Sequence, residues 1–409
     1  MYKKKEISIW NLIFGVVILY IIMPIISRAI STYLTTYFML LIVLLIYFHT
    51  ILRYRAESFN DYIGGLMLPF VFFQAVMFTY RTNSLLLWGY SVLLWLIPLV
   101  IGHYFIQYRI KDITTISKII IIAFSITIVT TCVGLIQNPF ASRVLATISS
   151  SQDVNAIMYN WKNIGGYEFV YFLVLLYPIL ILAYKQRRVN FVFTAIGTFM
   201  IFATVILSEY ATALLLIMCT SILFLCKKNL DKRGVYILLI VSTLILVFFS
   251  DSISRFLTYI AETIGSETIG ERFLALAGGS DTLNSFDDNR IELYQRSLNT
   301  FLEHPIIGTF FSKSSAIGGH SFVLDTLAQM GILGGLLLFF MYKKIYNYFI
   351  AIFKTQVGYG YVLWAFLQAI LLSIINTGMW LEILAMIMPI LVANIYRYGD
   401  KNYENTLDS

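Results

Sequence analysis

The stretch IIIIAFSITIVTTCVGLIQ, residues 119–137, contains no charged side chain. A run of about 20 apolar residues is long enough to cross the hydrocarbon core of a bilayer as a helix. The rest of the chain has the same character, because 59% of its 409 residues are hydrophobic and only 12% are charged. Soluble proteins usually carry about 25% charged residues. The composition therefore excludes an ordinary soluble globular fold.

Eleven other apolar runs accompany this one along the chain. Together they predict an all-α polytopic integral membrane protein with about 12 transmembrane helices joined mostly by short turns. The predicted spans are residues 8–27, 33–52, 63–80, 85–106, 119–137, 167–184, 191–208, 210–226, 235–250, 320–342, 359–376 and 380–396.

The distribution of Lys and Arg predicts the orientation of these spans. With the N-terminus in the cytoplasm, 20 of the 29 basic residues fall in cytoplasmic segments, and every cytoplasmic gap holds at least two. Crowding of Lys and Arg on the cytoplasmic side is the usual arrangement in membrane proteins. We therefore expect a multi-pass protein with both termini in the cytoplasm. The net charge of +7 then reflects topology and gives no reason to expect nucleic-acid binding.

Two of the predicted external loops are long, residues 138–166 and 251–319. The second loop divides the chain, so we expect nine spans in residues 1–250, a helical external loop in residues 251–319, three more spans in residues 320–396 and a cytoplasmic tail in residues 397–409. A loop of this length in a compact protein usually forms a lid or a binding element. Its nine acidic residues outnumber its five basic ones.

The second loop contains one clear amphipathic helix. Asn289 and Glu292 have the spacing of a capping box, and Pro305 predicts the end of the helix. Apolar residues recur between them at helical spacing and centre the apolar face near Tyr294 and Leu298. We expect this helix to lie against the outer membrane surface or the top of the bundle.

Three arginines of this loop are candidate ligands for an anion. Arg290 lies at the border of the apolar face, where it either reaches into a cleft beneath the loop or only snorkels or forms a salt bridge. Arg296 lies on roughly the opposite side of the helix and is the weaker candidate. Arg272 lies upstream in the same loop and would join the same cationic cluster.

The segment EHPIIGTFFSKSSAIGGHSFVLDTLAQMGILGG, residues 303–335, contains a second group of candidates. His320 begins a span on the external side, where it is either a proton-transfer group or an interfacial helix-start residue. Ser321, Asp325 and Gln329 then form a polar stripe that descends into the bilayer. An intramembrane Asp is either functional or an anchor to a neighbouring helix. The glycines at the end of the segment permit close approach of another helix.

The order of these features resembles the polysaccharide polymerase and O-antigen ligase superfamily. The resemblance covers about residues 270–340, where an arginine-led helix ends in HPIIG and the next span opens with GGHSFVLDTLAQMGILGG. It implies a GT-C-type glycosyltransferase with a large external loop between spans 9 and 10. Members that build O-antigen or capsule are Wzy-type polymerases, and the resemblance implies inverting, metal-independent transfer without a cofactor.

The resemblance also implies substrates, partners and residue roles. Donor and acceptor are glycans on undecaprenyl pyrophosphate, and the site opens to the outer face of the bacterial cytoplasmic (inner) membrane. Membrane lipid, a polysaccharide chain-length regulator and a flippase are the expected partners. His320 corresponds to the general base and Arg290 to the catalytic pyrophosphate ligand. Arg272 is a looser match to an upstream arginine of the same loop. From the residues themselves, we expect Arg272 and Arg296 to bind substrate and Asp325 to tune the site.

The chain departs from the superfamily at the outer end of an earlier span. Members frequently carry a Ser-Arg pair there, whereas this chain reads SEYATA, with Glu209 and no arginine. Glu209 is therefore a candidate substrate ligand, and Arg143 or Arg81, both external, are candidates for the missing charge. Asn376 and Glu382, near the outer ends of the last spans, are weaker candidates. The usual GxG after the proline is replaced by GTFF.

Two other functions remain open at this point. An O-antigen ligase of the same superfamily, which transfers a finished glycan to its final acceptor, is compatible with the sequence. A lipid-linked oligosaccharide flippase can also have twelve spans, but a transporter places charged residues near the midplane of several helices and often shows repeat symmetry. This chain concentrates its polar residues on the external side, which favours the enzyme.

Overall fold

The computed structural model describes most of the chain outside the long loops. The described residues are 9–29, 38, 41–42, 44–46, 48–49, 52, 70, 72–74, 76–77, 85–139, 141–147, 160–226, 234–236, 240, 289–312 and 317–397. All regular structure within these ranges is helical, with no strand among them. The predicted all-α class is therefore supported.

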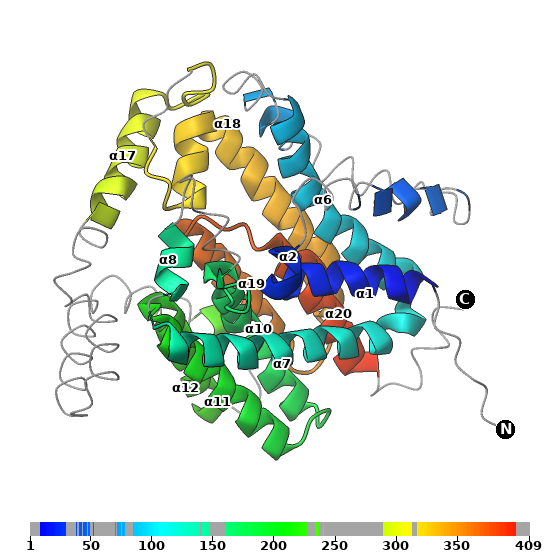
Figure 1. Ribbon diagram of the computed structural model, residues 1–409. Coiled ribbons are helices and arrows are strands. Elements are labelled where there is room, and N and C mark those ends of the chain that lie inside the picture. The colour runs from blue at the N-terminus through cyan, green and yellow to red at the C-terminus, as the bar shows by residue number, and fades with distance from the viewer. Residues whose placement is uncertain are drawn as a thin grey trace, which may run out of the picture.

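The helices pack against one another around an apolar core (Figure 1). Their bounds are α1 (Ile9–Ile22), α2 (Pro24–Ser27), α6 (Leu85–Tyr108), η1 (Ile110–Asp112), α7 (Ile113–Gln137), α8 (Ala141–Thr147), α10 (Tyr167–Lys185), α11 (Phe191–Ser208), α12 (Ala211–Cys226), α17 (Asn289–Glu303), α18 (Phe322–Ile345), η2 (Tyr346–Ile350), η3 (Ala351–Phe353), α19 (Tyr359–Ile375), η4 (Glu382–Ile387) and α20 (Met388–Arg397).

Four of these helical segments are long and apolar enough to cross a membrane: Ile110–Gln137, Tyr167–Lys185, Phe191–Ser208 and Phe322–Phe353. Shorter apolar helices occupy Asn11–Ile22, Leu96–Tyr108, Thr212–Ile222, Tyr359–Ile375 and Glu382–Tyr396. Each of these segments overlaps a predicted span, which agrees with a polytopic membrane protein. The predicted spans 33–52, 63–80 and 235–250 lie largely outside the described residues, so the number twelve stays a prediction.

One end of the bundle, which we call the basic end, carries several Lys and Arg residues at its helix ends. The beginning of α1 and the end of α20 lie together at this end (Figure 1). Hydrogen bonds join its turns, since Arg188 Nε donates to the Ile395 carbonyl (2.8 Å) and Gln186 Nε2 to the Val357 carbonyl (2.6 Å). The basic residues at the helix ends here are Arg109, Lys111, Lys185, Arg187, Arg188 and Lys354.

The opposite end of the bundle, which we call the aromatic end, carries a cluster of large rings. Trp380 lies 5.5 Å from Tyr171 and 6.4 Å from Tyr167 between ring centroids, and Tyr210 lies 5.5 Å from Tyr167. The loop before α10 is fixed here, because the Gly165 amide donates to Thr131 Oγ1 at 2.8 Å. The ends of α7, α11 and α19 and the beginnings of α10 and α12 therefore meet at this end.

The predicted tenth span is a broken helix rather than a straight one. Gly331, within α18, has φ 63° and ψ −160°, and the two halves of α18 meet there at a sharp bend (Figure 1). The first half folds back on the second, because a Cβ at Gly334 would lie 2.2 Å from Met330 Cβ and one at Gly335 would lie 2.6 Å from Leu327 Cδ2. The close approach that these glycines predicted is confirmed, but its partner is the first half of the same span.

The HPIIG loop after α17 fills this break. The amides of Ile332 and Leu333 donate to the carbonyls of Pro305 (2.8 Å) and Ile306 (3.3 Å), and the Thr309 amide donates to the Ala328 carbonyl (3.0 Å). Helix ends leave amides and carbonyls without partners inside the helix, and a buried end needs partners from elsewhere. The HPIIG sequence and Thr309, which follows it, therefore cap the two new helix ends.

Gly331→Ala is expected to destabilise the protein by about 2 kcal/mol or more, because a left-handed conformation costs a non-glycine residue that order of energy. The new Cβ would also lie 2.3 Å from the Ile306 carbonyl carbon. The thermal unfolding midpoint of the purified protein in detergent measures the effect. Gly15→Ala is the matched control, since its Cβ would meet only the tip of Ile119 at 3.3 Å. Equal midpoints for the two variants would contradict the capping role.

Candidate active site

Helix α17 docks on the first half of α18 through a polar face. Ser297 is 1% and Thr300 is 6% exposed, whereas Leu298 is 42% and Leu302 is 63% exposed. The predicted helix and its bounds are confirmed. Its Ser297 side contacts the bundle, so the apolar face does not pack on the bundle, and its contact with the outer membrane surface stays a prediction. The side of α17 that carries Ser297 faces the protein, because Ser297 has a hydrogen-bond partner there. Polar pairing therefore decides which side of this helix packs on the protein.

A closed set of hydrogen bonds joins α17, α18 and the turn before His320. Ser297 Oγ donates to Asp325 Oδ1 at 2.6 Å and accepts from the Gly318 amide at 2.8 Å. The Gly319 amide donates to the same Asp325 oxygen at 3.3 Å. A Cβ at Gly318 would lie 2.1 Å from the Leu293 carbonyl oxygen, so only glycine fits against α17 there. Asp325 is thus an anchor between helices that also holds the Gly-Gly turn.

His320 lies directly after this turn with an exposed side chain. The next residue, Ser321, caps α18 by accepting a hydrogen bond from the Leu324 amide at 3.1 Å. The Phe322 amide donates to the Asn376 carbonyl at 2.9 Å, which ties the start of α18 to the end of α19. The polar stripe predicted to descend into the bilayer therefore begins with a helix cap and a helix anchor. It lies on the first half of α18, before the break.

Arg290 belongs to the first turn of α17. It precedes Tyr294 by four residues and Ser297 by seven, so its Cα lies on the same side of the helix as theirs. That side faces the Gly-Gly turn and the end of α19, since Tyr294 donates to the Ile375 carbonyl at 2.7 Å. Arg296 is exposed, as its position opposite the buried side predicted. The structure thus brings the helix of Arg290 beside the turn of His320.

Ser297→Ala is expected to lower, about tenfold, the glycosyl transfer that the resemblance implies. The substitution removes the hydroxyl donor of the Asp325 carboxylate, and a hydrogen bond to a charged group contributes about 1.5–3 kcal/mol. It also frees the turn that positions His320. The rate of glycan transfer by membranes that carry equal amounts of each variant measures this. Asn299→Ala, on the exposed side of α17, is the control. Full activity of Ser297→Ala would show that the turn needs no such anchor.

The residues that replace the expected Ser-Arg pair lie at the break between α11 and α12. Glu209 is 3% exposed and adopts a left-handed conformation with φ 61°. Its neighbour Tyr210 donates to the Ser142 carbonyl at 3.0 Å and accepts from Ser142 Oγ at 3.0 Å. Arg143 follows Ser142 in α8, so the structure brings its backbone to this break. Its side chain, together with Arg272 and Arg81 entirely, lies outside the described part of the chain.

Arg28, directly after α2, fixes the loop before α10. Its Nη1 donates to the carbonyls of Trp161 (2.8 Å) and Ile164 (2.9 Å). Burial lowers the pKa of Arg28 from its ordinary value, and the nearby negative charge of Glu168 opposes that shift. A guanidinium with these hydrogen bonds has a structural role, because it holds the loop in place.

The turn between α19 and η4 belongs to the aromatic end, and little in the sequence indicates its role. Trp380 has φ 58°, and a bulky residue with positive φ is a genuine outlier of the kind that gathers at functional sites. The turn leads into η4, a π-helical segment that begins at Glu382. Single π-turns are also frequent at functional sites. The sequence identified Asn376 and Glu382 here only as weak candidates.

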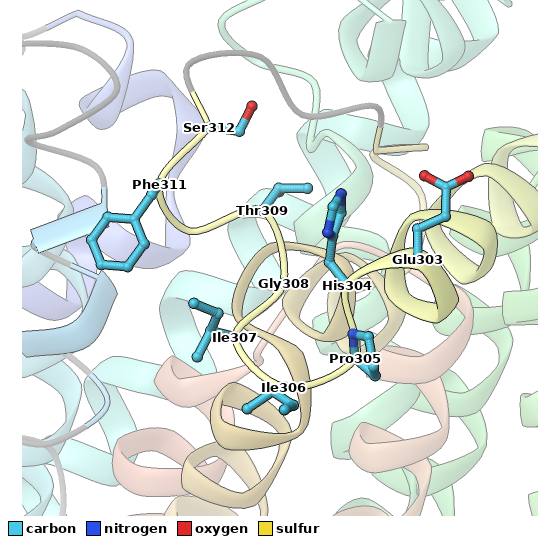
Figure 2. A pocket seen from close by; sticks show the side chains of 9 residues that line it. All are labelled: Glu303, His304, Pro305, Ile306, Ile307, Gly308, Thr309, Phe311 and Ser312. Carbon is cyan, nitrogen blue, oxygen red and sulfur yellow. The ribbon is translucent and has the colours of Figure 1, made fainter.

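An open pocket of about 650 Å³ lies beside the HPIIG loop. Figure 2 shows Glu303 and His304 at one edge, Ile306 and Ile307 below them and Phe311 on the far side. Ile306 is 73% exposed. The lining residues are Glu303, His304, Pro305, Ile306, Ile307, Gly308, Thr309, Phe311 and Ser312. None of the predicted site residues lines this pocket, so it is a surface hollow over the capping loop.

Residues 193–339 match the family model described as O-antigen ligase. The match begins in α11 and ends in the second half of α18, so it includes Glu209, Arg290, His320 and Asp325. It supports the O-antigen ligase and polymerase superfamily and a membrane enzyme that transfers glycosyl groups. It does not separate polymerases from ligases. No curated protein matches the chain.

Proposed function

We propose that the protein is a polysaccharide polymerase of this superfamily. It joins O-antigen or capsule repeat units, each carried on undecaprenyl pyrophosphate, at the outer face of the bacterial cytoplasmic membrane. The observation that carries the proposal is the docking of α17 on the turn before α18, within the segment that matches the family. This docking brings the helix of Arg290 beside His320, the two residues that the resemblance assigns to the chemistry.

The reaction requires stabilisation of a leaving pyrophosphate. The acceptor hydroxyl attacks the anomeric carbon from the face opposite the pyrophosphate, the sugar–phosphate bond breaks, and its electron pair leaves with the phosphate. A guanidinium pairs with phosphate oxygens bidentately and stabilises the charge that develops. Arg290 has this role in the proposal, and Arg272 and the exposed Arg296 assist it. Arg143, beside the break that carries Glu209, is the candidate for the missing Ser-Arg charge.

The same reaction requires a base. A sugar hydroxyl is a weak nucleophile, and a histidine within hydrogen-bond reach takes its proton as attack proceeds. His320 has an exposed imidazole on a backbone that three neighbouring elements hold in place. Asp325 acts through this backbone as a positioning residue.

The orientation of the bundle supports an external site. The basic end carries a cluster of Lys and Arg residues at its helix ends, and such an end faces the cytoplasm in membrane proteins. His320 and α17 lie with the aromatic end, and aromatic rings are enriched at membrane–water boundaries. We therefore assign both termini to the cytoplasm and the site to the external face. A chain-length regulator and a flippase are the proposed partners.

The alternative function is that of a ligase, which the description of the matching family favours. Deletion of the gene in its host followed by gel analysis of the surface glycan separates the functions. Collapse of the ladder to one repeat unit supports the polymerase. Loss of glycan from its final acceptor with retention of lipid-linked polymer supports the ligase. Repeat units trapped inside the cell support a flippase, and an unchanged ladder refutes all three.

A further inference from the structure

The aromatic end brings together two segments that are far apart in the sequence. The Trp380 ring reaches from the turn after α19 to the first turn of α10, where it contacts Tyr167 and Tyr171. Glu168 belongs to that same turn of α10. Glu382, two residues after Trp380, lies close enough to Glu168 for their charges to interact. Two carboxylates and an indole therefore share one place between α10 and η4.

Two buried donors on the same turn have no acceptor among the described residues. Trp380 is 3% and Asn376 is 5% exposed, and neither Trp380 Nε1 nor Asn376 Nδ2 has a hydrogen-bond partner within the described ranges. Buried polar groups in native proteins almost always have a partner, so each exception calls for an explanation. A missing ligand that supplies oxygen acceptors explains both.

The carboxylates beside these donors select the kind of ligand. Glu168 is exposed and Glu382 is half-buried. Arg28 lies near Glu168 and offsets part of its charge, but one cation does not neutralise two carboxylates. A pyrophosphate would be repelled by this pair of negative charges. A neutral or amino sugar suits it, because its hydroxyl groups donate to carboxylates while its oxygen atoms accept from N–H groups.

We propose that Glu168, Trp380, Asn376 and Glu382 form a sugar-binding subsite for the acceptor repeat unit. This subsite deepens the proposed function and rests on it. Glu168 and Glu382 accept hydrogen bonds from sugar hydroxyls, and the Trp380 and Asn376 nitrogens donate to sugar oxygens. Both nitrogens are covered in this structure, so the turn must shift when the sugar binds. The strained backbone of Trp380 marks where it shifts.

The location of the subsite suits delivery of the acceptor to the base. The Asn376 carbonyl accepts from the Phe322 amide at 2.9 Å, two residues after His320. A sugar held against this turn therefore lies beside the beginning of α18. The charged residues would also bind different parts of the substrates. The carboxylates bind the neutral sugar, and the arginines of the external loop bind the pyrophosphate.

The test uses the repeat-unit oligosaccharide itself, released by mild acid from the lipid-linked units that accumulate in the deletion strain. Its affinity for the purified full-length protein in nanodiscs is measured by titration calorimetry. Glu382→Gln, Glu168→Gln and Trp380→Phe are each expected to weaken binding about tenfold or more, the usual loss for a hydrogen bond to a charged or buried group. Glu292→Gln, an exposed carboxylate on α17, is the matched control and should bind as wild type does.

Arg290→Ala separates the subsite from the phosphate site. The released oligosaccharide has no pyrophosphate, so this variant should bind it with wild-type affinity. Wild-type affinity in all three subsite variants, or no binding by the wild-type protein, would overturn the subsite even if deletion collapses the ladder. An unchanged ladder on deletion would instead refute the proposed function. Glu168→Gln changes an exposed side chain and keeps its shape, so a folded variant is available if the others fail to fold.

Discussion

His320→Ala should leave the protein in the membrane and reduce the surface glycan to single repeat units. A positioned general base contributes about 10²–10⁴-fold to rate, and a polymer of many units disappears when each addition slows by that factor. The backbone around His320 is held by the Gly318 and Gly319 amides and by the Ser321 cap, none of which uses the imidazole. The variant should therefore fold.

The measurement is a gel of surface glycan from a deletion strain that expresses each variant, with the protein level checked by immunoblot. His304→Ala is the matched control, since His304 is also exposed on the same loop region but lines the surface hollow of Figure 2. Added imidazole should restore part of the activity of His320→Ala and none to a variant that is misfolded. A full glycan ladder from His320→Ala at normal expression would show that His320 is not the general base.

The helices of the bundle were predictable because their signal is the length of an apolar run. The helix that runs from Asn289 to Glu303 was predictable for a different reason, since its capping residue and its terminating proline are local features. Both signals depend on residues that are neighbours in the sequence. Local interactions of this kind decide where a helix begins and ends, whatever it later packs against.

The buried side of α17 and the break at Gly331 depend on partners that are distant in the sequence. Ser297 is buried because Asp325, 28 residues later, accepts its hydrogen bond. Gly331 adopts a positive φ because the carbonyls of Pro305 and Ile306 take the place of a helical turn. A glycine in an apolar run indicates close packing or a break equally well, and only the position of the HPIIG loop decides between them.

The candidate site was predictable in part for the same reason. Arg290 and His320 stand out as polar residues in a recognisable order, and the structure brings their elements together. Trp380 and Glu168 do not stand out, because a tryptophan and a glutamate near the ends of spans are common interfacial residues. Their proximity comes from the packing of α10 against the segment that follows α19.

Arg290→Ala is expected to lower the rate of transfer about 10²–10³-fold, the usual cost of removing one preorganised donor from a developing oxyanion. Arg290→Lys should recover only part of this loss, because an ammonium keeps the charge but cannot pair with two phosphate oxygens at once. Arg296→Ala should lose less, since its side chain is exposed on the other side of α17. Lys162→Ala, a cation of the loop before α10, is the control for a simple change in charge.

The product inhibition constant distinguishes an arginine that binds phosphate from one with a structural role. Undecaprenyl pyrophosphate is the product that leaves the proposed reaction, so it should inhibit wild-type transfer and inhibit Arg290→Ala about tenfold or more weakly, in line with the loss of a charge-assisted bidentate pair. A structural arginine would instead lower the amount of active protein and leave the inhibition constant of the remainder unchanged. An inhibition constant for Arg290→Ala equal to that of the wild type would therefore move the pyrophosphate to another cation, with Arg143 beside the α11–α12 break as the first to substitute.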